Sequence, residues 1–308
     1  MTMECTVVIP TFGRKQLLRR NLAALGRLDS GAWEVVVVDD GSDEPVNESD
    51  LGPLGDISGR LVRHPENQGR AAARNTGIRE AQGSVVVFLD DDMEPQPGFV
   101  SAHIAAHSGL ELSAVVGHFS FPKSPPPHGF SRYFETRGVY KLGRNAPMPF
   151  QYFITGNSSV SRELLQTVGG FDESLARWGG EDLELGYRMN ESGAVFRYEP
   201  LAKTVNHGER TISEMCVMSS DFGRDGIPTL VQRHPALSDV FRIDLLAPST
   251  GTIHRRWSRR IVRTLTLSPF RWAALKLVSA TESWRWPDWM YHYLIAAHWR
   301  KGLDEVAA

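Results

Sequence analysis

Three short apolar runs in the first third of the chain constrain its fold more than any other feature. They cover Cys5–Ile9, Glu34–Val38 and Ser84–Leu89, and none shows the polar alternation of a half-exposed strand. Continuous hydrophobicity is typical of strands buried on both faces, as in a parallel sheet covered by helices. Helical patterns at Lys15–Leu28 and Gly69–Ala81 lie between the runs. We therefore expect an α/β fold with a Rossmann-like, mostly parallel sheet flanked by helices.

Further along the chain the pattern is less regular. The segment Arg60–His64 is a candidate strand, and the proline-rich segment Ser120–Pro149 is expected to be a long functional loop. Helices are predicted at Ser161–Val168 and Glu181–Glu191, with another strand at Val195–Tyr198. These elements continue the α/β arrangement.

The tail from about Ile253 differs in composition, with six of the eight tryptophans and a cluster of arginines between Arg255 and Arg263. It is expected to form a helical C-terminal appendage. Tryptophan and arginine suit contact with an anionic membrane, but both also favour protein interfaces. The sequence leaves open whether the tail contacts a membrane, packs as core or forms a homo-oligomer.

Composition narrows the class of protein. The net charge of -2 gives no reason to expect nucleic-acid binding, and two cysteines suit a reducing compartment. No run approaches the roughly 20 apolar residues that span a bilayer, and the first residues lack the pattern of a signal peptide. We expect a cytoplasmic enzyme, either free or peripheral at the inner face of the membrane.

The strongest chemical signal is the run Asp90, Asp91 and Asp92 directly after the third apolar run. Three neighbouring carboxylates repel one another unless a cation neutralises them, and Mg²⁺ and Mn²⁺ prefer oxygen ligands. A solvated acidic turn is the plainer alternative. Because ligands bind at the carboxyl ends of strands in such sheets, a metal site is the stronger interpretation.

Two other acidic motifs stand beside glycines. Asp40, in Asp39-Asp40-Gly41-Ser42, follows the second apolar run, where a carboxylate can accept the imide proton of a uracil ring; Asp-Gly is also a common turn. Glu181 and Asp182, in Trp178-Gly179-Gly180-Glu181-Asp182, stand where a helix begins. Acids there can simply complement the helix dipole, but one beside a hydroxyl can also act as a general base.

Other nucleotide-binding classes lack their motifs in this chain. The first strand ends in Pro10-Thr11-Phe12-Gly13 rather than in the Gly-X-Gly-X-X-Gly turn of a dehydrogenase. A Gly-Lys-Ser/Thr phosphate loop is missing, as is the glycine-rich basic loop of nucleotidyltransferases.

The order of these motifs resembles family 2 glycosyltransferases of the GT-A fold. The segments Val7–Gly13, Asp39–Ser42, Asn67–Gly77, Asp90–Asp92 and Gly179–Asp182 carry the resemblance, which covers about residues 4–210. The Trp-Gly-Gly-Glu-Asp element is also similar to β-1,4-galactosyltransferases. The resemblance implies a GT-A domain at 1–210, with a nucleotide-binding half at about 1–118, an acceptor-binding half at about 119–210, and a helical extension at 211–308.

The resemblance also implies a role for each matching residue. Asp182 is the expected catalytic base, with Glu181 beside it on sugar hydroxyls. The expected metal ligands are Asp92, Asp90 and His207, which follows a predicted strand. The residues expected to bind the nucleotide sugar are Pro10, Thr11, Phe12, Arg14, Asp40, Arg74, Asp90 and Asp91. The residues expected at the acceptor are Asn157, Trp178, Gly179 and Gly180.

The implied function is a metal-dependent, inverting hexosyl- or N-acetylhexosaminyltransferase that uses Mn²⁺ or Mg²⁺. UDP is the expected donor nucleotide, with GDP and dTDP as alternatives. The acceptor is left open among a glycan, a lipid-linked sugar, a peptide and a natural product. A non-catalytic nucleotide- or glycan-binding module of the same fold is the competing class. Such a module is expected to have lost an acid from the Asp90–Asp92 run or Asp182, and all of these acids are present.

Overall fold

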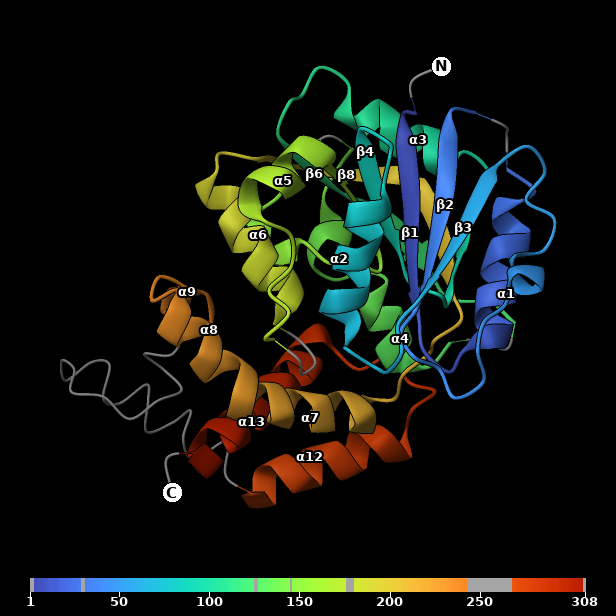
Figure 1. Ribbon diagram of the computed structural model, residues 1–308. Coiled ribbons are helices and arrows are strands. Elements are labelled where there is room, and N and C mark those ends of the chain that lie inside the picture. The colour runs from blue at the N-terminus through green and yellow to red at the C-terminus, as the bar shows by residue number, and fades with distance from the viewer. Residues whose placement is uncertain are drawn as a thin grey trace. The chain divides into compact units, whose positions relative to one another are not determined.

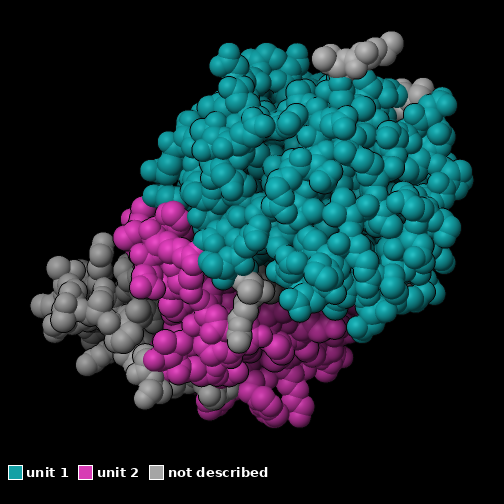
Figure 2. All heavy atoms as spheres, in the orientation of Figure 1, with its two compact units in different colours: residues 1–125, 135–176, 181–208 teal, residues 126–134, 177–180, 209–308 magenta. Residues whose placement is uncertain are grey.

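The computed structural model describes residues 3–28, 31–124, 127–144, 146–175, 180–242 and 268–306. The chain divides into two compact units (Figure 2). Unit 1 comprises Met1–Pro125, Glu135–Ala176 and Glu181–Gly208, and unit 2 comprises Pro126–Phe134, Arg177–Gly180 and Glu209–Ala308. The main division after Gly208 lies close to the boundary expected at residue 210, but two short earlier segments belong to unit 2.

Unit 1 is built on one sheet, whose described strands follow the order β3-β2-β1-β4-β7-β6-β8-β5 (Figure 1). The first four strands in that order are parallel, as the continuous valine runs predict, and β6 is parallel to β8. Strand β7 is antiparallel to both β4 and β6, and β5 is antiparallel to β8. The strands are β1 Cys5–Thr11, β2 Trp33–Asp39, β3 Ser58–Arg63, β4 Val85–Leu89, β5 Met93–Pro95, β6 Ser113–Ser120, β7 Asn157–Ser161 and β8 Val195–Asn206.

Helices flank this sheet (Figure 1). They bury the apolar side chains of the central strands, so that Val8, Val86 and Phe88 are inaccessible to solvent. The α-helices of unit 1 are α1 Lys15–Leu25, α2 Arg70–Glu80, α3 Phe99–His107, α5 Arg162–Val168 and α6 Glu181–Glu191, and its short 3₁₀ turns are η1 Glu48–Leu51, η2 Gly138–Lys141 and η3 Phe150–Tyr152.

The predicted α/β class and the flanking helices are confirmed. Helix α6 has the predicted bounds, whereas β8 runs eight residues beyond its predicted end, to Asn206. The expectation of a long loop at Ser120–Pro149 is wrong in part, because α4 (Gly129–Phe134) and η2 form inside it. Aromatic residues between the prolines are buried there, and their burial stabilises turns that sequence periodicity does not reveal.

The described part of unit 2 is helical, which confirms the predicted helical appendage. Its core joins Tyr133 of α4 to Cys216, Tyr291 and Leu294. Within the described residues, no helix combines the length and hydropathy needed to cross a bilayer. The predicted arginine cluster from Arg255 to Arg263 lies outside the described residues. Besides α4, the helices of unit 2 are α7 Ile212–Asp221, the π-helix η4 Phe222–Gly226, α8 Ile227–Arg233, α9 Leu237–Val240, α12 Ser268–Ala280 and α13 Asp288–Val306.

Candidate active site

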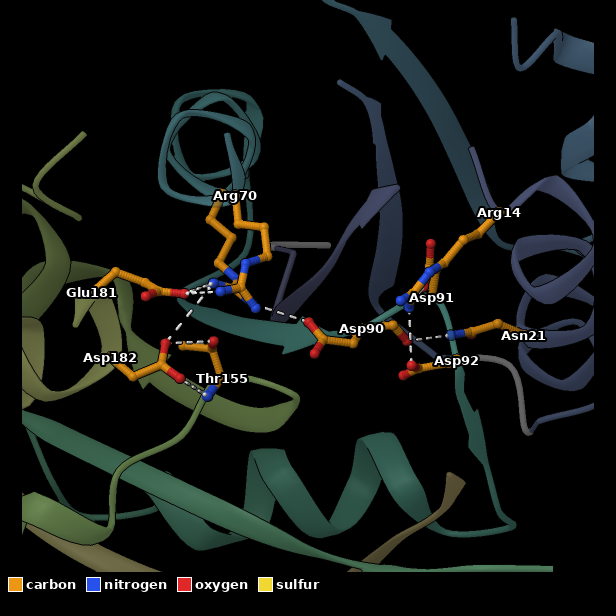
Figure 3. Close-up of polar contacts among 10 residues, drawn as sticks. Arg14, Asn21, Arg70, Asp90, Asp91, Asp92, Thr155, Glu181 and Asp182 are labelled. Atoms are coloured by element: carbon orange, nitrogen blue, oxygen red, sulfur yellow. Dashed lines mark hydrogen bonds and ion pairs between the residues drawn. The ribbon is translucent and has the colours of Figure 1, made fainter. Parts of the chain in front are cut away.

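The acidic run follows β4 directly and is held by the last residue of β1 and by Arg14 of the loop after it (Figure 3). The Thr11 hydroxyl donates to Asp91 Oδ2 at 2.8 Å. Arg14 Nη1 lies 3.3 Å from Asp91 Oδ1 and 3.0 Å from Asp92 Oδ2. Because β1 and β4 are parallel neighbours, their carboxyl ends meet and bring two separate motifs into contact.

A buried arginine connects this run to the acids that begin α6. Arg74, on α2, is 1% exposed, and its Nη2 lies 3.0 Å from Asp90 Oδ1. Its Nη1 lies 3.4 Å from Glu181 Oε1 and 3.8 Å from Asp182 Oδ1. Arg74 is therefore an internal counter-ion for three carboxylates, and its contact with the donor stays a prediction.

The two neighbouring acids of α6 have different surroundings. The Glu181 side chain is 5% exposed and also pairs with Arg70 Nη2 at 3.1 Å. The Asp182 side chain is 29% exposed, and its Oδ1 accepts the hydroxyl proton of Thr155 at 2.7 Å. The backbone N–H of Thr155 donates to Asp182 Oδ2 at 3.3 Å. Glu181 is thus fixed between two guanidinium groups (Figure 3), whereas Asp182 keeps access to solvent.

Burial and like charge disfavour ionised carboxylates in this site. Burial, together with the charge of Glu181, raises the pKa of Asp182 to about 6 against the opposing charge of Arg74. Burial also raises the pKa of Asp91 to about 7, although Thr11 and Arg14 act in the opposite direction. A carboxylate with a pKa near neutrality is suited to accept and release protons.

The donor set fits a divalent cation in its chemistry. Among the described residues, five carboxylates meet three guanidinium groups here, and carboxylate oxygens are the ligands that Mg²⁺ and Mn²⁺ prefer. In the described parts of the chain, no three His, Cys, Asp or Glu side chains already stand together as a metal-binding group. The described residues thus supply oxygens of the kind that a divalent cation binds.

The main chain after β8 lies against the acidic run. The His207 N–H donates to the backbone oxygen of Asp92 at 2.8 Å, and a Cβ on Gly208 would come within 2.1 Å of Asp92 Oδ2. The imidazole, however, is used elsewhere. Its Nδ1 accepts from Arg20 Nη1 at 2.9 Å, so Nε2 carries the proton and donates to Glu94 Oε2 at 2.7 Å. Its role as a metal ligand stays a prediction.

The acids after β2 are satisfied by their own chain. Asp40 is 4% exposed and accepts from His64 Nδ1 at 2.7 Å and from the backbone N–H groups of Gln68 and Gly69 at 3.0 and 2.9 Å. Asp39 has no exposed surface and accepts three further donors. Direct recognition of a base by Asp40 stays a prediction, and in this structure its carboxylate orders the loop before α2.

The side chain of Asn157 is buried and hydrogen-bonded within the protein. It is 3% exposed; its Oδ1 accepts from His103 Nε2 at 2.9 Å, and its Nδ2 donates to the backbone oxygens of His118 and Ala202. His103 in turn contacts Ser159 Oγ at 2.8 Å, so the amide belongs to a buried network between α3, β7 and β8. The expected contact of Asn157 with the acceptor stays a prediction.

The remaining predicted residues differ in accessibility. Phe12 is 48% exposed at the end of β1, next to the buried Thr11, and Pro10 lies within that strand. Gly180 is buried directly before α6. The expected acceptor residues Trp178 and Gly179 lie outside the described residues.

Sequence reasoning missed three residues of this site. Asn21 donates to the backbone oxygen of Asp90 at 3.0 Å, and Thr155 and Arg70 hold the acids of α6. Arg70 precedes Arg74 by one helical turn, so its spacing could have revealed it. Nothing in the sequence around Thr155 marks it, because its partner is 27 residues away.

Comparison with known proteins defines the class and then the family. The fold is that of GT-A glycosyltransferases: a mannosyltransferase from Pyrobaculum calidifontis, solved in complex with GDP-Man and Mn²⁺, superposes with a TM-score of 0.59 over 98% of this chain and 88% of that one, at 21% identity. The model of glycosyl transferase family 2 matches residues 6–169, more than half of the chain, and this protein belongs to that family. A second model, the N-terminal domain of galactosyltransferase, matches residues 141–210.

Curated relatives are consistent with this family. A pre-mycofactocin glycosyltransferase of Mycobacterium tuberculosis is 34% identical over 240 residues, covering 75% of this chain and 48% of the relative. A validoxylamine A glucosyltransferase of Streptomyces hygroscopicus is 32% identical over 261 residues, covering 75% of this chain and 61% of the relative. This chain therefore spans about half to three fifths of the length of these relatives.

Proposed function

We propose that this protein is a metal-dependent, inverting glycosyltransferase that transfers a hexose or N-acetylhexosamine from a nucleoside-diphosphate donor to an acceptor hydroxyl. The observation that carries the proposal is the environment of Asp182. Its carboxylate is partly accessible, oriented by Thr155, and has a pKa raised toward neutrality. These are the properties required of a general base.

In the proposed reaction, Asp182 takes the proton of the acceptor hydroxyl. The acceptor oxygen then bonds to the anomeric carbon of the donor while the bond from that carbon to the diphosphate oxygen breaks. The diphosphate leaves with the electron pair of that bond. Attack from the face opposite the leaving group inverts the anomeric configuration, so NMR of a product that kept the donor's configuration would refute this mechanism.

The residues of the acidic run bind and neutralise in this proposal. Asp92 and Asp90 would hold Mn²⁺ or Mg²⁺. His207 would become a third ligand once its imidazole gives up its contacts with Arg20 and Glu94. A bound divalent cation supplies positive charge that stabilises the leaving diphosphate. In this proposal Arg14, with about half of its side chain exposed, would contact the diphosphate, and the exposed Phe12 would lie against the base.

The donor nucleotide is proposed to be UDP. GDP and dTDP remain in the test, because the similar mannosyltransferase was solved with GDP-Man. The relatives are named for pre-mycofactocin and validoxylamine A, which favours the natural product among the expected acceptors; a glycan, a lipid-linked sugar and a peptide stay as alternatives.

Titration calorimetry with UDP, GDP and dTDP, each with and without Mn²⁺, tests the donor site. We expect one nucleotide to bind in a metal-dependent manner, Asp92→Ala to abolish that binding, and the exposed control Asp56→Ala to retain it. If no nucleotide binds under any condition, the transferase proposal fails. If nucleotide binds but no sugar is transferred or hydrolysed, the non-catalytic module replaces it.

A further inference from the structure

A set of polar side chains is buried in unit 1 between α3 and β7. It consists of His103 and His107 on α3, Asn157 and Ser159 on β7, and Ser113 at the start of β6, each no more than 6% exposed. We call this set the α3–β7 network. Burial of polar side chains costs free energy unless they are hydrogen-bonded, so the direction of each bond matters.

The contacts of Asn157 fix the direction of the bonds around it. Its Nδ2 donates to the backbone oxygens of His118 and Ala202 at 3.0 and 2.9 Å, so its Oδ1 faces His103. His103 Nε2 therefore carries a proton and donates to that Oδ1 at 2.9 Å. The other ring nitrogen, Nδ1, accepts from the Ser159 hydroxyl at 2.8 Å. His103 is thus the donor for the amide oxygen.

Both histidines of the network are neutral near pH 7. His107 Nε2 donates to Ser159 Oγ at 2.7 Å, and its Nδ1 accepts from the Ser113 hydroxyl at 2.6 Å. Burial lowers the pKa of His107 to about 3 and that of His103 to about 4, although the bond of His103 to Asn157 acts in the opposite direction. A neutral imidazole has one N–H, and His103 uses it on Asn157.

Asn157 also belongs to a segment that reaches the candidate active site. Two residues before it, the hydroxyl and the backbone N–H of Thr155 donate to Asp182. The backbone oxygen of Gly156 accepts from the Asp90 N–H at 3.1 Å. Three successive residues therefore contact the proposed base, the acidic run and the α3–β7 network.

The amide of Asn157 lies tightly against the neighbouring strand. A Cβ on Gly117 would come within 2.4 Å of Asn157 Oδ1 and 2.6 Å of its Nδ2. The pairing of β6 with β8 is irregular between Gly117 and His118, where this amide lies. Loss of the donor from His103 would leave the buried Oδ1 without a partner, which is unfavourable. The amide could then find a new donor only by moving, together with its main chain.

We propose that His103 is a positioning residue for the carboxylate of Asp182. Through its bond to Asn157 it sets the place of the segment 155–157, and thereby the hydrogen bond from Thr155 to that carboxylate. The inference rests on the proposed function, in which Asp182 is the base. It adds a residue of α3, outside the candidate active site, to those that determine how the base meets the acceptor.

The other groups that act on the pKa of Asp182 are Glu181, Arg74 and Arg70. Glu181 raises this pKa by like charge, and the two arginines lower it. None of the three belongs to the α3–β7 network, so a change at His103 would reach Asp182 through Thr155. A network that only stabilises the core would leave the pKa of Asp182 unchanged.

NMR titration of the full chain, labelled with ¹³C at its aspartate carboxyls, tests the proposal without a substrate. The signal of Asp182 is assigned by its loss in Asp182→Asn. His103→Asn can still reach Ser159 but is too short to reach Asn157. It should raise the pKa of Asp182 by about one unit, because the ionised form loses the Thr155 hydroxyl. His103→Gln should keep the wild-type value, since its amide nitrogen lies as many bonds from the main chain as Nε2 does.

Two further variants separate positioning from a loss of stability. His298→Asn changes a buried histidine of α13 in unit 2 and should leave the pKa of Asp182 unchanged. His103→Asn combined with Thr155→Val should raise it by about one unit in total, because both changes remove the same bond, whereas independent effects would add to about two. If His103→Asn does not fold, His103→Leu removes the same donor.

An unchanged pKa of Asp182 in the folded variant without the donor would overturn the proposal. So would an equal shift in His103→Asn and His103→Gln, or a shift of about two units in the double variant. The expected shifts in a protein that transfers no sugar would support the positioning of Asp182 and refute its role as a base. Sugar transfer together with an unchanged pKa would refute the positioning alone.

Discussion

Two groups of acids differ in the partners that balance their negative charge. One group follows β2, and the other lies after β4 and at the start of α6. Asp39 and Asp40 accept backbone N–H groups of the loops after β2 and β3, and they also contact the side chains of Arg63 and His64. Around Asp90, by contrast, five carboxylates share three guanidinium groups among the residues that the structure describes, and burial raises the pKa of Asp91 and Asp182. An acid whose carboxylate is hydrogen-bonded within the protein stabilises the loop that supplies its donors. Several carboxylates that lie close together instead favour the binding of a metal ion or the uptake of a proton from a substrate.

The largest effect on turnover is expected when Asp182, the proposed base, is replaced. Asp182→Asn should lower kcat about a thousandfold, because no carboxylate then accepts the acceptor proton. Donor affinity by calorimetry and thermal stability should stay close to wild type, since Asn can still accept from Thr155. Glu181→Gln, which weakens two ion pairs, is expected to lower the melting temperature instead. A parallel loss of donor affinity in Asp182→Asn would make Asp182 a structural residue.

Removal of an acid after β2 is expected to affect stability rather than chemistry. Asp39→Ala leaves the N–H groups of Ser42 and Val46 buried without an acceptor and takes the partner from Arg63. We expect the free energy of unfolding in urea to fall by about 3 kcal/mol. The exposed Asp43→Ala is the matched control and should stay within about 0.5 kcal/mol of wild type. Equal stability of the two variants would show that the acids after β2 are not a scaffold.

The pH dependence of turnover sharpens the comparison further. Asp182 must be ionised to accept a proton, and its pKa is raised to about 6, so the rate should be constant above that pH and fall below it. About tenfold should be lost for each pH unit well below the pKa. A pH profile of kcat/KM for the acceptor, which reports the pKa of the base before the acceptor binds, measures this. An acid limb near pH 4 would mean that burial does not perturb the base.

The smallest effect concerns the residue that orients the base. Thr155→Val removes the hydroxyl donor to Asp182 and should lower kcat at pH 7 about fivefold, with the acid limb moved up by about one unit. KM for the donor should not change. Thr155→Ser keeps the hydroxyl and should restore both the rate and the pH profile. A purely structural role would lower stability in the valine variant without moving the limb.

Much of the fold could be predicted because it is encoded locally. Four valines in succession at Val35–Val38 are typical of a strand covered on both faces, and the observed burial of each is complete. The acids at strand ends were also readable, since parallel strands bring their carboxyl ends to one edge. The α3 helix and β6 strand were not predicted, and the antiparallel insertion of β7 depends on pairing with two strands distant in sequence.

What each acid does was decided by tertiary structure. The sequence by itself determined an α/β chain with acidic strand ends, an acidic start to α6 and a cationic, tryptophan-rich tail. Only the folded chain set Arg74 between Asp90 and Glu181, gave Asp182 the hydroxyl of Thr155, and used the amide of Asn157 inside the core. The physical reason is that charge, hydrogen bonding and burial depend on neighbours in space, and those neighbours come from elements far apart in the chain.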